Sequence, residues 1–376
     1  MDSLFNVDDI TVEMPNQTIG DNIAKISVIG VGGGGCNMIN HMIQEGTHKI
    51  DLIAANTDLQ VLNISKAPKK IQLGVKLTKG LGAGMKPEVG RDSAVESYED
   101  IKNALKGTDI IFIAAGLGGG TGTGAAAIIA KAAKEVGALT VSVVTKPFTW
   151  EGKKRAGLAN LGLEELKKVS DSIIVVPNDR LLDIIDENVG MKDAFKIIDN
   201  ILYQAVNGMS EVILNPGNSD INTDFADVKT IMQHKGMALM GIGKAKGEDA
   251  AQRALEDAID SPLLDKVSLS GAKGILIHFN IHPQVSLFAI NNVMGSIHDN
   301  IDSNAEIIFG TTSDSTLEKD EVKITIVATG FESKNDMNDD LEDNKPETTK
   351  VNLSANDENY LDIPPLMRDY VVQYHL

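Results

Sequence analysis

The chain has 376 residues with 42% apolar side chains, which is enough for two domains with buried cores. Its formal net charge of −18 argues against nucleic acid as a partner, because the phosphate backbone would be repelled. No run of about 18 apolar residues occurs, so we expect no direct insertion into a membrane. The single cysteine, Cys36, excludes an internal disulfide and is typical of a reducing cytoplasm.

The first half of the chain has the pattern of a parallel α/β domain. Residues 1–22 are polar and lack periodicity, and we expect a disordered N-terminal arm. Over residues 23–190, short apolar strands alternate with helical stretches such as Ala125–Val136. The predicted strands are Ile26–Ile29, Leu52–Asn56, Ile110–Ala115, Thr140–Thr145 and Ser172–Pro177. This alternation predicts a Rossmann-like parallel sheet with helices on both faces, whose ligand binds beyond the carboxyl ends of the strands.

Two glycine-rich loops follow predicted strands, at Gly30–Asn37 and at Gly116–Gly124. Glycine lets backbone N–H groups approach an anion without obstruction by a Cβ atom. A helix that begins just beyond such a loop adds the positive end of its dipole. Two loops on strands that can be neighbours therefore predict a cradle for the phosphates of a nucleotide. A third glycine-rich segment, Lys79–Gly90, either closes over the terminal phosphate or is a plain surface loop.

The first loop also fits another class of nucleotide-binding protein. Gly30-x-Gly32-x-x-Gly35 matches the dinucleotide fingerprint, which leaves an NAD-dependent oxidoreductase as an alternative. The acid expected after the next strand of that fold is replaced by Asn56-Thr-Asp58. The P-loop pattern is absent, which argues against a Walker-type site. We interpret Cys36 as a small residue in a crowded turn rather than a reactive thiol.

Two sets of charged residues have spacings that allow more than one role. Glu151 and Arg155 are four residues apart and share one face of a helix, either as a surface ion pair or as ligands for ribose and phosphate. Asp224 and Asp227, with Asn222, either position a water or cation beside a phosphate or cap a helix. The seven histidines form no cluster with the spacing of metal ligands.

The second half of the chain begins with a long amphipathic helix, predicted over residues 191–213 from apolar residues at spacings of three and four. A smaller α/β domain is predicted over residues 214–331, in which Gly241-Ile-Gly243 is interpreted as a turn at a strand end. Its predicted strands are Met237–Ile242, Gly274–Ile281, Ala305–Phe309 and Val322–Ala328, and its predicted helices are Glu248–Ile259 and Ser286–Ile301. Residues 332–357 are acidic and predict a disordered linker, and residues 358–376 turn apolar again, as in a docking peptide.

Several of these motifs occur in the order found in one family. They are Gly32–Gly35, Asn56–Asp58, Lys79–Gly84, Gly118–Gly124, Thr145–Phe148 with Glu151 and Arg155, Asn222–Asp227, Ser261–Leu264 and Tyr360–Pro364. In this combination the chain resembles the tubulin/FtsZ family, and within it the FtsZ GTPases of bacterial cell division, over about residues 23–331 and again at the tail. The resemblance implies a tubulin-like fold and a GTPase that polymerises head to tail in the cytoplasm, at the mid-cell division ring beneath the inner membrane.

The resemblance also implies roles for individual residues. The residues implied to hold phosphates are Gly33, Gly34, Gly35, Gly120, Thr121 and Gly122, with Cys36 in the same loop and Ala83 and Gly84 near the terminal phosphate. Those implied to contact guanine are Asn37, Asn178, Phe195 and Asp199, while Glu151 takes the ribose and Arg155 the phosphate side. Asn222, Asp224 and Asp227 are implied to enter the site of the next subunit and orient the attacking water.

The implied cofactors are GTP and GDP with Mg²⁺ on the phosphates, and K⁺ as a candidate second cation. The implied partners are further copies of the chain, membrane-anchoring division adaptors that bind Tyr360–Arg368, and other regulators of the ring. A scaffold that polymerises without hydrolysis is a further alternative. Trp150, the only tryptophan, stands beside Glu151 and is expected to report nucleotide binding by its fluorescence.

Overall fold

The computed structural model describes residues 24–47, 49–183, 185, 188–214, 225–234, 236–261, 269–299 and 301–331. The predicted N-terminal arm, acidic linker and docking peptide lie outside these residues, as does the whole segment of residues 215–224. None of the described helices is long and apolar enough to span a lipid bilayer.

Six parallel strands build the first part of the sheet. They are β1 (Ile26–Val31), β2 (Ile50–Asn56), β3 (Lys69–Gln72), β4 (Ile110–Gly116), β5 (Leu139–Lys146) and β6 (Ser172–Pro177). Their order is β3-β2-β1-β4-β5-β6, so the direction of progression reverses between β1 and β4. The predicted parallel α/β architecture is confirmed. Because Gly30 of β1 is in register with Ala114 of β4, the two glycine-rich loops leave the sheet side by side.

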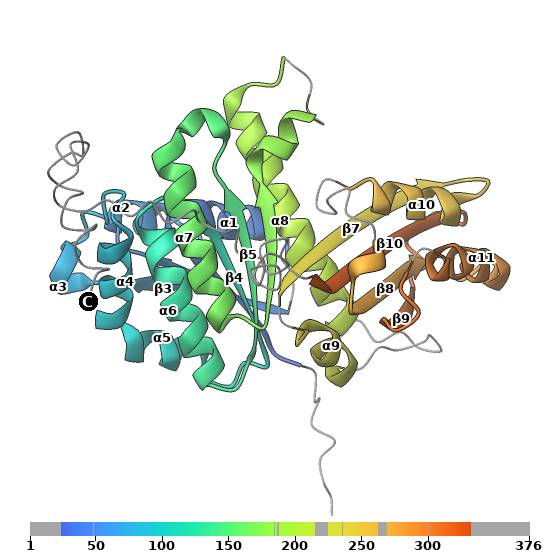
Figure 1. Ribbon diagram of the computed structural model, residues 1–376, viewed down its shortest axis with the longest axis horizontal. Helices are drawn as coiled ribbons and strands as arrows, with labels where there is room; N and C mark the ends of the chain where they lie inside the picture. Colours follow the sequence, from blue (N-terminus) through green and yellow to red (C-terminus); the bar gives the residue numbers. More distant parts are fainter. Residues whose placement is uncertain are drawn as a thin grey trace, which may run out of the picture. The chain divides into compact units, whose positions relative to one another are not determined.

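Helices cover both faces of this sheet (Figure 1). They are α1 (Gly32–Gln44), α2 (Leu59–Ile64), α3 (Val75–Thr78), α4 (Pro87–Glu96), α5 (Tyr98–Leu105), α6 (Thr121–Glu135) and α7 (Lys153–Val169), with the short 3₁₀ turns η1 (Thr149–Glu151) and η2 (Asn178–Asp183). Alternate residues of a strand point to opposite faces. Ile111 and Ile113 therefore pack with α5, α6 and α7, whereas Phe112 packs with α1 and α8 (Met191–Leu214) on the other face.

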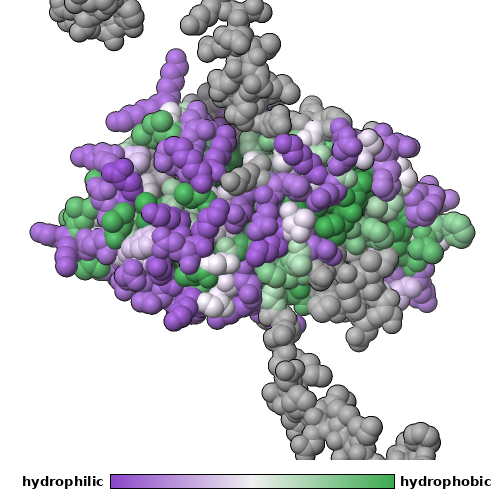
Figure 2. Space-filling view, turned by 60° about the horizontal axis from the view of Figure 1, so that its bottom comes forward, coloured by the Kyte–Doolittle hydropathy of each residue, from purple (hydrophilic) through white to green (hydrophobic). Residues whose placement is uncertain are grey.

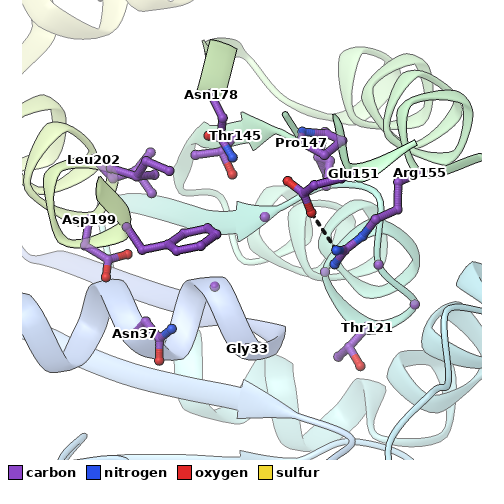
Figure 3. Close-up of a pocket in the computed structure, with 18 residues that line it drawn as sticks. Gly33, Asn37, Thr121, Thr145, Pro147, Glu151, Arg155, Asn178, Asp199 and Leu202 are labelled. Carbon is purple, nitrogen blue, oxygen red and sulfur yellow. Dashed lines mark hydrogen bonds and ion pairs between the residues drawn. The ribbon is translucent and has the colours of Figure 1, made fainter. Parts of the chain in front are cut away.

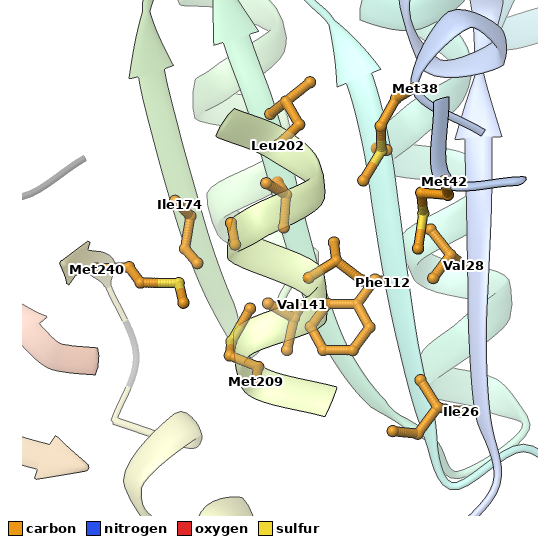
Figure 4. Close-up of a cluster of buried hydrophobic side chains, with 14 of the residues drawn as sticks. Ile26, Val28, Met38, Met42, Phe112, Val141, Ile174, Leu202, Met209 and Met240 are labelled. Atoms are coloured by element: carbon orange, nitrogen blue, oxygen red, sulfur yellow. The ribbon is translucent and has the colours of Figure 1, made fainter. Parts of the chain in front are cut away.

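The long helix α8 connects the two halves of the described chain. Figure 4 shows its Leu202 and Met209 beside Phe112 and Val141 of the sheet and Met38 of α1. All five side chains are almost completely buried, so α8 is held by a continuous aliphatic core. The predicted long central helix is confirmed.

The C-terminal elements continue the same sheet. They are α9 (Phe225–Met232), β7 (Met237–Lys246), α10 (Ala250–Ile259), η3 (Leu269–Gly271), β8 (Gly274–Ile281), α11 (Leu287–His298), β9 (Glu306–Ser313) and β10 (Glu321–Phe331). Strand β7 pairs with β6 in parallel over two residues and with β10 in antiparallel orientation. Strand β10 also pairs antiparallel with β8, and β9 pairs parallel with β8 and forms this edge of a ten-stranded sheet.

Three local predictions are wrong or incomplete. Gly241-Ile-Gly243 is not a strand-end turn but lies inside β7, which continues to Lys246. A Cβ atom at Gly243 would overlap the carbonyl oxygen of Ala254, so this glycine allows α10 to pack directly on the strand. The first glycine-rich segment is largely helical, because α1 already begins at Gly32. Strand β3 and the helices α4 and α5 were not predicted.

Candidate functional site

A cavity of about 450 Å³ opens at the carboxyl ends of β1, β4, β5 and β6. It combines eleven of the predicted site residues: Gly33, Gly34, Asn37, Gly120, Thr121, Gly122, Glu151, Arg155, Asn178, Phe195 and Asp199. Seven further residues line it, to which the sequence assigned no individual role: Gly116, Leu117 and Gly119 of the second glycine-rich loop, Thr145 and Pro147 of the motif Thr145–Phe148, and Ile198 and Leu202. Figure 3 shows how side chains from α1, α7, η2 and α8 surround the same space.

Two helices begin at one end of this cavity. Helix α1 starts at Gly32 and α6 starts at Thr121, and neither has a side-chain cap or an acidic residue in its first turn. The first N–H groups of a helix have no partner within the helix and carry the positive end of its dipole. Two uncapped N-termini of helices 13 and 15 residues long therefore make this end of the cavity suitable for phosphate groups.

The glycines at this end serve two different purposes. A Cβ atom at Gly35 would overlap the carbonyl oxygen of Ala114, and one at Gly122 would overlap that of Gly116. These two glycines let the loops and strands approach one another. Gly33 and Gly119 line the cavity, yet a Cβ atom at either would meet nothing within 4 Å. Packing within the protein therefore gives no reason for these two glycines, whereas close approach of a ligand does.

The third glycine-rich segment lies against the start of α6. A Cβ atom at Gly120 would stand 2.8 Å from the Cβ of Ala83 and 3.0 Å from the backbone nitrogen of Lys86. Thr57 and Thr121 share a hydrogen bond of 2.6 Å between their hydroxyl groups beside this contact. The segment is thus at the phosphate end, although Ala83 and Gly84 are not among the residues that line the cavity.

Glu151 and Arg155 form an ion pair of 2.5 Å and also face the cavity (Figure 3). The second carboxylate oxygen of Glu151 accepts the backbone N–H of Phe148 at 2.9 Å, which fixes the 3₁₀ turn η1. The Nε atom of Arg155 is buried and has no hydrogen-bond partner. The structure thus shows the ion pair, and it places both residues in the wall of the cavity, while their role as ligands for ribose and phosphate stays a prediction.

The opposite end of the cavity carries groups suited to a planar base. Asn178 is 5% exposed, and its Oδ1 atom has no hydrogen-bond partner. Burial raises the pKa of Asp199 to about 6, although nearby His41 opposes the shift. Phe195 is 40% exposed and lies edge-on to Phe148, with ring centroids 6.0 Å apart. The amide of Asn178 and the carboxyl of Asp199 can form hydrogen bonds with the edge of a base, and the ring of Phe195 can contact its face.

Two groups of predicted residues lie elsewhere. The Cys36 side chain is fully buried in the core, and burial raises the pKa of its thiol to about 11. Asn222 and Asp224 lie outside the described residues, and Asp227 stands in the first turn of α9, away from the lining of the cavity. Among the described lining residues, the only acids are Glu151, which is already paired, and Asp199 at the base end.

Comparisons with known proteins agree with this geometry. Residues 25–186 match the model of the Tubulin/FtsZ family, GTPase domain, and residues 236–332 match that of the FtsZ family, C-terminal domain. An empty FtsZ dimer of M. jannaschii is 46% identical, with 82% of this chain and 88% of that chain covered and a TM-score of 0.75. A tryptophan-to-tyrosine mutant of FtsZ from M. jannaschii is 45% identical, with 82% and 92% covered and the same TM-score.

A more distant structure shows the same fold. The protofilament of CetZ2 from Haloferax volcanii, bound to GTPγS, is 19% identical, with 85% of this chain and 97% of that chain covered and a TM-score of 0.69. At this identity the likeness concerns the fold alone. The two family matches and the M. jannaschii structures, by contrast, cover most of the described chain at high identity. The chain therefore belongs to the tubulin/FtsZ family of GTPases and carries the C-terminal domain of the FtsZ family.

Proposed function

We propose that this chain is a GTPase that assembles head to tail into filaments, and that adjacent subunits complete each hydrolytic centre. The observation that carries the proposal is the placement of α8. Asp199 lies at the base end of the cavity, and Leu214 ends the helix 15 residues later, about 22 Å further along its axis. The predicted catalytic segment begins there and leads to Asp227 on α9, which packs on β8 and β9. The distance along α8 supports our proposal that these acids serve the cavity of another copy rather than that of their own chain.

Each part of GTP has a suitable place in the cavity. We expect the phosphates at the N-termini of α1 and α6, and the ribose and phosphate side beside Glu151 and Arg155. The guanine then reaches Asn178 and Asp199, with Asn37 on the neighbouring helix and Phe195 against the ring. The cavity of about 450 Å³ is of the size usual for such ligands.

Mg²⁺ would enter this site together with the phosphates. The described residues contain no group of three or more His, Cys, Asp or Glu side chains that could hold a metal ion. Phosphate oxygens are ordinary Mg²⁺ ligands, and the ion commonly keeps several waters. When bound, the ion neutralises charge that develops on the phosphates. K⁺ is a second cation that we propose for the same end of the site.

Hydrolysis requires a group that orients the attacking water. Glu151 cannot readily do so while both of its oxygens are engaged, by Arg155 and by the backbone of Phe148. Asp224 and Asp227 of the next subunit supply carboxylates, with Asn222 beside them. This division explains why the nucleotide would be bound by each chain alone but hydrolysed only after assembly.

Exposed apolar side chains provide surfaces for such assembly. On the phosphate side of the cavity, Val75, Leu77, Leu81 and Met85 are between 44% and 86% exposed. In the C-terminal part, Leu287 and Phe288 of α11 are 75% and 79% exposed. Figure 2 shows hydrophobic residues gathered on the side that carries the C-terminal elements. Large exposed apolar side chains that lie together are typical of protein interfaces. The dimer reported for M. jannaschii FtsZ supports self-association of this chain too.

We propose that the filaments act in cell division, in the cytoplasm at the mid-cell ring beneath the inner membrane. Attachment to the membrane would then be indirect, through adaptors that bind Tyr360–Arg368, and other ring regulators would bind the same filaments. This segment lies outside the described residues. Family membership favours this role over the dinucleotide-dependent oxidoreductase suggested by Gly30-x-Gly32-x-x-Gly35.

Phosphate release from GTP, measured against protein concentration, tests the proposal. We expect almost no turnover per molecule below a critical concentration and a steep rise above it. Asp227→Ala should keep GTP binding and lose turnover, whereas the control Asp257→Ala, which removes an exposed acid of α10, should keep both. A rate per molecule that does not depend on concentration would contradict the shared site. Normal filaments that release no phosphate, and whose stability is unchanged in Asp227→Ala, would indicate the non-hydrolysing scaffold.

A further inference from the structure

The most exposed aromatic side chain near the cavity is that of Trp150, in the turn η1. Its residue is 60% exposed, and it is absent from the lining of the cavity. Its ring is stacked on Phe148, with centroids 5.4 Å apart and planes inclined by 20°. Phe148 itself is only 3% exposed. One face of the indole is therefore packed on the core, while much of the ring remains accessible from outside the cavity.

The turn that carries Trp150 is held in place by its neighbours. Asp179 of η2 accepts the backbone N–H of Thr149 at 2.9 Å and its hydroxyl at 2.6 Å. Glu151 accepts the backbone N–H of Phe148 at 2.9 Å. The position of the indole is thus fixed on both sides of the residue before any partner arrives. A fixed aromatic side chain loses little conformational entropy when a partner covers it, which is the property of an interface anchor.

Further apolar side chains lie on the elements next to this turn. Leu182 of η2 is 55% exposed, and Met191 at the start of α8 is 66% exposed. Phe195 is one helical turn after Met191, so both occupy one face of α8. We call Trp150, Leu182, Met191 and Phe195 the apolar rim. The elements that carry the apolar rim contact one another: Asp179 of η2 accepts a hydrogen bond from Thr149 of η1, and Phe148, just before η1, contacts Phe195 of α8.

We propose that Trp150 is an anchor of the subunit interface, and that the next copy of this chain covers its exposed indole face in the filament. This inference rests on the proposed function, because the next copy must approach the cavity to bring in Asp224 and Asp227. Glu151 and Arg155, one and five residues after Trp150, form part of the cavity wall. A subunit seated over that wall therefore meets the apolar rim. Tryptophan at the centre of such a contact commonly dominates its binding energy.

The fluorescence of the chain provides a direct test, because Trp150 is the only tryptophan. Emission and light scattering are recorded together while protein concentration is raised at saturating GTP. We expect the emission to shift to shorter wavelength at the concentration at which scattering appears. Below that concentration, addition of GTP or GDP should leave the emission unchanged. This expectation differs from that of the sequence, which made Trp150 a reporter of nucleotide binding.

Substitution tests the energetic part of the inference. Trp150→Ala should raise the critical concentration for GTP-dependent assembly about 30-fold, the effect of losing a hot-spot residue. Trp150→Phe, which keeps a ring on Phe148, should recover most of the loss. Leu161→Ala is the matched control, because Leu161 is 67% exposed on α7 but does not line the cavity. GTP affinity of the dilute variants and their thermal unfolding show whether each site and fold is intact.

The outcomes separate this inference from the proposed function. A wild-type chain that never assembles with GTP overturns both. If the wild-type chain assembles, but Trp150→Ala has a normal critical concentration and the emission of Trp150 does not change on assembly, only the role of Trp150 as an interface anchor is overturned. If nucleotide alone shifts the emission of dilute protein and Trp150→Ala weakens GTP binding, then Trp150 contacts the ligand, and the inference is again wrong.

Discussion

Gly33→Ala and Gly35→Ala separate the two purposes of glycine in the first loop. Both residues lie in the first turn of α1, and both would gain the same methyl group. At Gly33 the new Cβ atom would meet nothing within 4 Å and would project where Gly33 lines the cavity. At Gly35 it would overlap the carbonyl oxygen of Ala114 and the backbone of Gly30. One substitution therefore changes the site and the other changes the fold.

The two expected effects differ in kind and size. Gly33→Ala should not lower stability, because alanine is favoured over glycine in a helix by up to about 1 kcal/mol. It should weaken GTP binding about 10- to 150-fold, as expected when a methyl group prevents one charge-assisted hydrogen bond worth about 1.5–3 kcal/mol. Gly35→Ala should cost about 3 kcal/mol or more, because both overlapping neighbours are backbone and cannot move aside. This corresponds to a fall in Tm of roughly 5 °C or more for a unit of this size.

Thermal unfolding followed by circular dichroism and titration of a labelled GTP analogue into dilute protein measure both effects. The titration is carried out below the critical concentration so that assembly does not contribute. Gly33→Ala that binds GTP as wild type does would refute the placement of phosphate at the start of α1. Gly35→Ala with an unchanged Tm would refute the claim that this glycine is required for contact between α1 and the sheet.

Two further predictions concern titratable groups. The pKa of Asp199 is about 6 in the fold and about 3.9 in an unfolded chain, so its stabilising contribution is complete below pH ~4 and is lost as the pH rises through 6. Asp199→Asn should therefore raise the free energy of unfolding of the nucleotide-free protein at pH 7.5 by about 1–3 kcal/mol, which unfolding curves across pH measure. The same substitution should weaken GTP binding, which the titration with a labelled GTP analogue measures. The thiol of Cys36 is buried with a pKa of about 11, so a thiol reagent at pH 8 should label the native chain at least ~100-fold more slowly than the unfolded chain; equal labelling rates would contradict its burial.

The sequence predicted those parts of the site that depend on local pattern. Glycine runs after apolar strands mark the carboxyl edge of a parallel sheet, and the register of Gly30 with Ala114 brings the two runs together. The sequence did not identify Ile198 and Leu202 as residues that line the cavity, because their helical spacing is the same as that of core residues. Thr145 and Pro147 belong to the motif Thr145–Phe148, but the sequence assigned no ligand contact to either, because nothing in their residue types marks a ligand site.

The errors in the fold arise where tertiary contacts decide. Strand β3 contains Lys69-Lys70-Ile71-Gln72, with a single apolar residue, because it lies at the edge of the sheet and is only partly buried. Gly243 looks like a turn residue in sequence, and only the position of α10 explains its presence inside a strand. Asn222 and Asp224 lie outside the described residues, so their roles stay predictions of the resemblance.

Two of the five buried polar atoms that lack a partner among the described residues belong to residues that line the cavity, an observation that does not depend on family membership. Arg155 and Asn178 each keep a buried polar atom without a partner, Asp199 has a raised pKa, and two helices begin there without side-chain caps. The buried atoms of Arg155 and Asn178 and the buried carboxyl of Asp199 destabilise the protein in the absence of a ligand, since buried polar groups without partners are costly. A nucleotide would supply acceptors for the N–H groups and donors for the carbonyl and carboxyl oxygens. GTP at a hundredfold excess over its Kd stabilises the fold by about 2.7 kcal/mol and should raise Tm markedly. At the same GTP concentration the rise in Tm should be smaller in Gly33→Ala, because the Kd of this variant is expected to be higher.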